Sequence, residues 1–183
     1  GLYANIEAGF IAATGAREPW TLRLPSAIFG FLTVLGVFFL TRELFRKTRK
    51  HNVIALLSAF FLATSFWHVN FSRIGFRAIM APFFLVWASF FLIRAIRLGA
   101  RPHRQLVFAA IGGLAFGLGF YSYIAYRVSP LLLLIVVPFF WRERGFWKTA
   151  GVFTAVAFFV ALPIGLYYLA NPADFMGRTT QVS

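Results

Sequence analysis

The sequence predicts an all-α protein, a polytopic transmembrane helix bundle of about six spans with a short N-terminal interfacial helix. Hydrophobic residues make up 60% of its 183 residues and charged residues 13%, against about 45–50% and about 25% in soluble domains. The 18 Lys and Arg fall in short clusters between long apolar runs, as they do in loops at membrane surfaces. We expect one transmembrane domain over residues 1–183, a fragment of a longer protein because the chain starts with Gly1.

The net charge of +13 raises the alternative of nucleic-acid binding. A nucleic-acid interface needs its cations gathered on one soluble face, whereas here apolar runs separate them. We therefore expect membrane lipid as a partner and no nucleic acid. The sequence contains no Cys, which excludes disulfides, thiol catalysis and Cys-ligated zinc.

Residues 1–16 carry apolar side chains at three- and four-residue spacing, which predicts a short helix. This helix is too short to span and includes Glu7. It either lies in the membrane interface or ends a longer helix. Gly15, Pro19 and Pro25 mark the loop that follows.

Six apolar runs follow, and the first, Leu24 to Thr41, is charge-free and long enough to cross about 30 Å of hydrocarbon. The fifth is free of charge for only 14 residues, or about 21 Å of helix. It requires a thinned bilayer, snorkelling of Arg127 and Arg142, or a re-entrant helix. Gly113 and Gly117 in the fourth form a GxxxG motif that favours close helix packing. The predicted spans are 24–41, 53–71, 78–97, 105–126, 128–141 and 150–170.

The distribution of Lys and Arg predicts the orientation. Loops 42–50, 94–104 and 142–148 hold five, four and three of them, twelve of the 18, and the opposite side holds the other six. The richer side is expected to be cytoplasmic. We therefore predict an integral membrane protein of the bacterial inner (plasma) membrane, with its functional face toward the periplasm or exterior.

Polar side chains gather on the predicted outer face. A cationic segment between two apolar spans is a candidate functional site, and guanidinium groups match phosphate oxygens with forked donors. Interfacial Arg and Tyr also have a plain structural explanation, in headgroup contact and the aromatic belt. The candidate substrate- and phosphate-binding residues are His68, Arg73, Arg77, Tyr123, Tyr126 and Arg127, with Tyr121, Asp174 and Arg178 nearby.

His68 has three interpretations: a general base, a metal ligand or an interfacial residue. With no Cys and few acids nearby, we expect no metal site. We expect Glu7 to make a structural contact with an Arg rather than to act in catalysis. We expect Asp174 to be a loop or helix-capping residue. No paired-carboxylate, Ser-His-Asp or phosphate-loop pattern is present.

Four segments resemble the bacterial polytopic glycosyltransferases of the GT-C class, relatives of dolichyl-phosphate-mannose protein mannosyltransferases and of the aminoarabinose transferase that modifies lipid A. Their order and spacing carry the resemblance over nearly the whole chain. The segments are 22–30 with 41–45 (LRLPSAIFG, TRELF), 67–77 (WHVNFSRIGFR), 121–130 (YSYIAYRVSP) and 171–178 (NPADFMGR).

The resemblance implies transfer of a sugar from a polyprenyl-phosphate carrier to a lipid, glycan or protein acceptor at the outer face. The polyprenyl-phosphate-linked sugar would be the donor, with no certain cofactor. The resemblance also places the catalytic Asp or Glu in a first outer loop upstream of Gly1, so the catalytic residue stays unassigned. Family mannosyltransferases carry an Asp shortly after the second-loop Arg, where this chain has Ala78. The sugar and acceptor are therefore left open.

Two other functions stay open at this point. A transporter or flippase of lipid-linked anions would need polar residues near the middle of the bilayer and paired broken helices. A non-catalytic membrane subunit would need only a basic face for anionic lipid. The spans contain few polar residues, which favours the enzyme.

Overall fold

The computed structural model describes residues 2–15, 18–99, 101–135 and 137–171, and within them every regular element is a helix. The all-α prediction is therefore confirmed for this part of the chain. In order, the elements are α1 (Leu2–Thr14), α2 (Pro19–Leu44), α3 (His51–Thr64), α4 (Phe66–Arg73), η1 (Arg77–Ile79), α5 (Met80–Arg97), α6 (Pro102–Gly119), η2 (Ile124–Val128), α7 (Ser129–Leu134), α8 (Val137–Phe140) and α9 (Phe146–Ala170).

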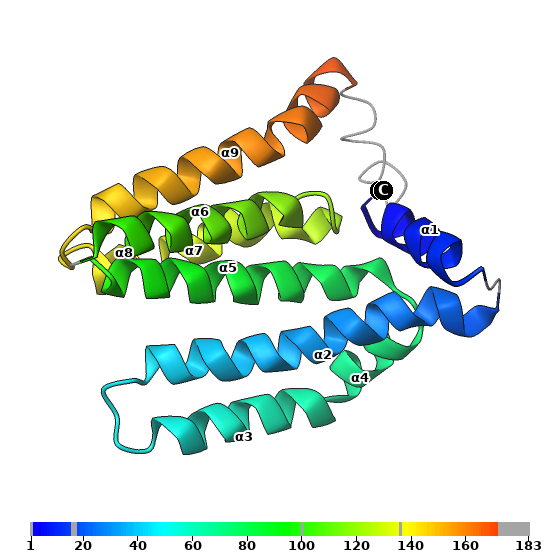
Figure 1. Ribbon diagram of the computed structural model, residues 1–183, viewed down its shortest axis with the longest axis horizontal. Coiled ribbons are helices and arrows are strands. Elements are labelled where there is room, and N and C mark those ends of the chain that lie inside the picture. The colour runs from blue at the N-terminus through cyan, green and yellow to red at the C-terminus, as the bar shows by residue number, and fades with distance from the viewer. Residues whose placement is uncertain (1, 16–17, 100, 136, 172–183) are drawn as a thin grey trace, which may run out of the picture.

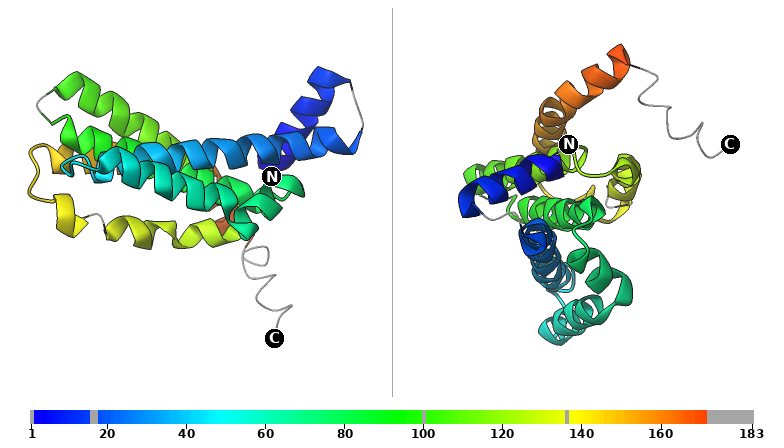
Figure 2. Two further views of the ribbon diagram at one scale, coloured as in Figure 1. Left: turned by 90° about the horizontal axis from the view of Figure 1, so that it is seen from below. Right: turned by 90° about the vertical axis from the view of Figure 1, so that its right-hand side faces the viewer.

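The long helices lie side by side in the order α3, α2, α5, α6 and α9, each packed on its neighbour (Figure 1). The α2–α3, α5–α6 and α8–α9 connections all lie at one end of the bundle, at the left in Figure 1. We call it the basic end because its three connections carry most of the Lys and Arg. Helices α1 and α4 and the last turns of α9 lie at the opposite end in both figures (Figure 2), which we call the site end.

Helix α5 forms the centre of the core. Its residues 80, 84, 88, 92 and 96 repeat every four positions, so they share one face, and all five are buried. They form one apolar cluster with Phe116 of α6 and Phe153 of α9. The GxxxG prediction is also confirmed: a Cβ on Gly113 would lie 2.4 Å from the Phe153 carbonyl oxygen, and one on Gly117 would lie 2.6 Å from the Val160 Cβ.

Three helical segments in the described part of the chain are long and apolar enough to cross a membrane: Pro19–Leu44, Arg77–Arg97 and Phe146–Ala170. They match the predicted spans 24–41, 78–97 and 150–170. A fourth is possible if the bent pair His51–Thr64 and Phe66–Arg73 counts as one span, which matches 53–71. The structure therefore supports an integral membrane protein with three or four spans, and the prediction of six is not confirmed.

The predicted spans 105–126 and 128–141 take a different form. Helix α6 begins at Pro102 with His103 and Arg104 in its first turn and stops at Gly119, because the chain then turns through residues 120–123. The second apolar run is divided among η2, α7 and α8. Its Pro130 and Pro138 cannot donate backbone hydrogen bonds. The described residues of this run form short helical pieces, with Pro130 in the first turn of α7 and Pro138 in α8.

Candidate functional site

The predicted polar segment 65–77 is a bend followed by a short helix. The axes of α3 and α4 differ by 59°, and the break falls at Ser65, which has an extended backbone (φ −65°, ψ 126°). After α4 the chain turns at Gly75, whose φ of +73° favours glycine. The bend directs α4 along the start of α2 and places its polar residues at the site end.

Small residues hold α4 against α2. The Ser26 hydroxyl donates to the Ser72 carbonyl oxygen at 2.8 Å, and Ser26 is fully buried. One turn further, Gly30 allows a contact that a side chain would prevent, since a Cβ there would lie 2.6 Å from the Ser72 Cβ. This close packing fixes the position of α4, and of Arg73 at its end, relative to α2.

His68 takes part in the same packing. Its Nε2 lies 3.1 Å from the carbonyl oxygen of Gly30. A carbonyl oxygen only accepts, so Nε2 carries the proton in this contact. While the bond holds, this nitrogen cannot serve as a general base. The structure therefore gives His68 a positioning contact between α2 and α4.

A cavity of about 590 Å³ lies between α2 and the α3–α4 bend. It brings Arg23 of α2 beside Arg73 and Asn70 of α4, and no acid is among its lining residues. Arg77, also a candidate, is exposed on η1 and is not in the lining. We call this the arginine cavity. It is lined by Arg23, Thr64, Phe66, Val69, Asn70, Arg73 and Ile74.

Arg23 was not among the residues predicted for the site. It lies 50 positions before Arg73, in the segment that the sequence predicts to be a loop marked by Gly15, Pro19 and Pro25. The structure instead places it in the first two turns of α2, at the height of α4. The sequence feature that could have identified Arg23 as a site residue is its position in the segment LRLPSAIFG, which carries part of the family resemblance.

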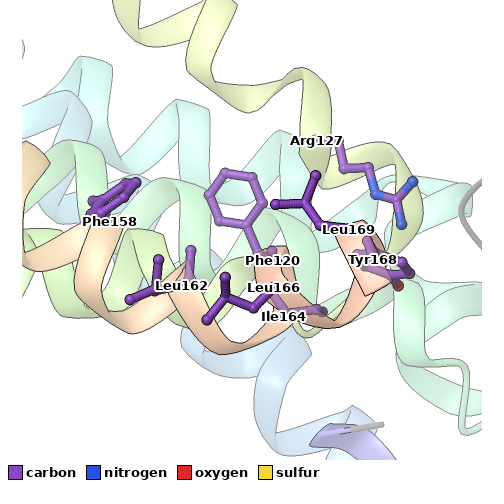
Figure 3. Close-up of a pocket in the computed structure, with 10 residues that line it drawn as sticks. Phe120, Arg127, Phe158, Leu162, Ile164, Leu166, Tyr168 and Leu169 are labelled. Atoms are coloured by element: carbon purple, nitrogen blue, oxygen red, sulfur yellow. The ribbon is translucent and has the colours of Figure 1, made fainter. Parts of the chain in front are cut away.

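Arg127 lies in a second, largely apolar groove of about 820 Å³ (Figure 3). The groove follows the last turns of α9 and is closed by Phe120 after α6. At one end the Arg127 guanidinium lies 4.5 Å from the centre of the Tyr168 ring, an attractive cation–π geometry. The Tyr121 hydroxyl donates to the Val160 carbonyl oxygen at 2.9 Å and so ties the turn before η2 to α9.

The two candidate tyrosines of this segment have different surroundings. Tyr126 is 3% exposed, and its ring packs on Phe116 and Phe120 with centroids 5.6 Å and 5.5 Å away. Among the described residues its hydroxyl has no hydrogen-bond partner. Tyr123 is half-buried, with its ring 6.1 Å from Phe76. Tyr126 therefore lies in the core, and Tyr123 lies nearer the surface.

The two described acids at this end, Glu7 and Glu18, line neither cavity. Glu7 is half-buried on α1, and burial raises the pKa of its carboxyl, because desolvation disfavours the charged form. Glu18 accepts a hydrogen bond from the Trp20 indole at 2.7 Å. Asp174 and Arg178 lie outside the described residues. Within the described ranges no group of three or more His, Asp and Glu is arranged to hold a metal ion.

These features define a class: an integral membrane protein of apolar helices with an arginine-lined cavity at one end of the bundle. The sequence model of the dolichyl-phosphate-mannose-protein mannosyltransferase family matches residues 2–170. The chain therefore belongs to this family of membrane glycosyltransferases. Comparison with curated proteins and with solved structures gives no match.

Proposed function

We propose that this protein is a GT-C type glycosyltransferase that moves a sugar from a polyprenyl-phosphate carrier to a lipid, glycan or protein acceptor. The observation that supports it best is the arginine cavity, in which two guanidiniums and the Asn70 amide share a space with no acid. Guanidinium donors match phosphate oxygens. An anionic carrier headgroup is the ligand that this charge and shape favour.

The proposed sugar transfer uses the two guanidiniums of the arginine cavity. The bond between the sugar C1 and the phosphate oxygen breaks, and the phosphate leaves with the electron pair. The acceptor hydroxyl oxygen forms a new bond to C1 and gives its proton to a base. Arg23 and Arg73 would stabilise the charge that grows on the departing phosphate. No described acid lines the cavity, so the base is left unassigned.

The groove at Arg127 provides a second place for lipid. Its lining is apolar except for the Arg127 guanidinium and the Tyr168 hydroxyl at one end, which suits a lipid chain with an anionic end. Both cavities are built from elements at the site end. Two cavities at one end are consistent with a two-substrate reaction. On the charge count of the loops, we propose that this end faces the periplasm or exterior.

The test is transfer of labelled sugar from a polyprenyl-phosphate donor by the complete protein in membranes. Arg73→Ala should lower the transfer rate by about 10²–10³-fold, the cost typical of removing one preorganised charge-stabilising donor. Arg73→Lys should recover part of the loss, because Lys keeps the charge but not the fork. Arg42→Ala, an exposed cation at the basic end, is the matched control and should keep full activity.

Unchanged transfer in Arg73→Ala and in Arg23→Ala would remove the phosphate-binding role. Movement of the labelled carrier across the membrane without sugar transfer would instead favour a flippase. One structural feature supports keeping that second candidate: the 59° break between α3 and α4, since broken helices are typical of transporters. The described part of the chain has a single such pair, whereas transporter folds use two.

A further inference from the structure

The basic end contains two turns that are joined to each other. A Cβ on Gly99, in the α5–α6 turn, would lie 2.0 Å from the carbonyl oxygen of Arg144 in the α8–α9 turn, so the two backbones are in direct contact. The side-chain amide of Gln105 donates to the Gly145 carbonyl oxygen at 2.9 Å and to the Thr149 hydroxyl at 2.7 Å. Gln105 and Thr149 are buried, which makes this a fixed junction.

The junction gathers exposed cations from both turns. Five Lys and Arg are exposed on it, with one exposed acid, Glu143. No ion pair to any of the five is present within the described residues. These cations repel one another unless an anion lies between them. The five are Arg101, Arg104, Arg142, Arg144 and Lys148, and we call them the joined-turn cluster.

Exposed tryptophans place this cluster at a membrane surface rather than in bulk water. Trp141 is 48% exposed and Trp147 is 71% exposed, and both flank the α8–α9 turn. The Arg142 guanidinium lies 5.1 Å from the centre of the Trp141 ring. Exposed Trp next to apolar helices is typical of the headgroup level of a bilayer, where phospholipid phosphates lie.

The other cation group at this end has a different arrangement. The α2–α3 turn carries Arg46, Lys47, Arg49 and Lys50, all exposed, but the hydrogen bonds of its described residues 45–50 are all local, and none joins it to a second connection. Arg46 lies 4.0 Å from Glu43. A single turn of this kind attracts anionic lipid diffusely. It therefore serves as an internal comparison for the joined turns.

We infer that the joined-turn cluster is a binding site for an anionic phospholipid headgroup with two phosphates, independent of the sugar-transfer site. The positive charge of five cations on two fixed turns complements the negative charge of a headgroup that presents two phosphates. Basic pockets between helices at a membrane surface bind such headgroups. Because the junction is held by its own hydrogen bonds, the site exists before the lipid arrives. The proposal does not depend on which leaflet this end faces.

The experiment uses the complete protein in mixed micelles of phosphatidylcholine with cardiolipin as the two-phosphate probe, with retained lipid counted by native mass spectrometry. Wild-type protein should retain cardiolipin in preference to phosphatidylcholine. Arg101→Gln with Arg144→Gln should weaken cardiolipin binding by at least about tenfold, since each cation near the lipid contributes a several-fold effect. Arg46→Gln with Lys47→Gln removes the same charge at the same end and should keep nearly all of the binding.

In the absence of added phosphate, three results would overturn the inference: no preference of the wild type for cardiolipin, equal retention in all variants, or equal loss in both double variants. The last would show diffuse surface charge rather than a built site. The substituted side chains are exposed, so folding is not expected to change, and thermal unfolding of each variant checks this. Soluble inorganic phosphate at the cardiolipin phosphate concentration should not displace the lipid. Displacement would show a site for free phosphate and would contradict the assignment to lipid.

Discussion

Two pairs of arginines in the bundle have opposite surroundings. At the basic end Arg94 and Arg97 converge on Glu43, with nitrogen–oxygen distances of 2.9 Å and 3.3 Å, and Arg97 also donates to the Glu43 carbonyl. At the site end Arg23 and Arg73 line a cavity whose described lining contains no acid. Glu43 is 7% exposed, so its charge requires those partners. The difference shows that partners, not residue type, separate a structural arginine from a candidate ligand-binding one.

The largest effect is expected at the site end, from Arg23→Ala combined with Arg73→Ala. If both guanidiniums contact one phosphate, each single substitution should lower kcat/KM for the donor, and the double variant should lose less than the product of the two losses. A loss of about 10³-fold for the double variant is expected from typical donor-deletion costs, with thermal stability unchanged. Transfer kinetics of the four proteins measure this coupling. Strictly multiplicative losses would separate the two residues and contradict a shared ligand.

For the Glu43 cluster at the basic end we expect the opposite result, a loss of stability with little change in activity. Glu43→Gln should leave Arg94 and Arg97 without their countercharge and lower the free energy of unfolding by about 2–4 kcal/mol, as breaking a largely buried ion pair does. Activity per folded molecule should change little. Thermal unfolding in detergent gives the stability. Glu143→Gln, an exposed acid at the same end, is the control and should be close to neutral.

A smaller effect tests how α4 is positioned. Gly30→Ala places a Cβ within 2.6 Å of the Ser72 Cβ, so α4 must move away from α2, at a cost of about 1–3 kcal/mol. Because Arg73 ends α4, apparent affinity for the donor should fall more than kcat. Gly9→Ala is the control, since a Cβ there meets nothing within 4 Å. Normal donor affinity in Gly30→Ala would show that this contact does not position Arg73.

The smallest effect concerns Glu7 on α1. Burial raises the pKa of this carboxyl above its ordinary value. A raised pKa in the folded state means that stability is complete below the ordinary value and declines as pH rises through the folded-state pKa. Glu7→Gln should remove that decline, with a change in Tm of less than about 2 °C at neutral pH. Melting curves from acidic to neutral pH would show it, and identical pH dependence in both proteins would count against the burial effect.

Much of the fold followed from the sequence because lipid imposes simple rules. A backbone in hydrocarbon must satisfy its own hydrogen bonds, so the apolar runs had to be helices, and three of the six predicted spans correspond to long helices in the structure. The division of residues 128–141 was harder to predict. Its limited length of 14 charge-free residues indicated that it differs from the other spans, but length alone does not say where the helical pieces begin and end.

By itself, the sequence determined that this is a helical membrane protein with a cationic segment between two spans, because hydropathy and charge are local properties. Only the tertiary structure determined which groups the candidate site residues contact. It paired Arg23 with Arg73 across 50 residues, turned His68 toward the Gly30 carbonyl, placed the Tyr126 ring in the core and gave Arg127 a separate groove. These outcomes depend on which helix faces which, and that is set by the contacts of small and apolar residues far apart in the chain.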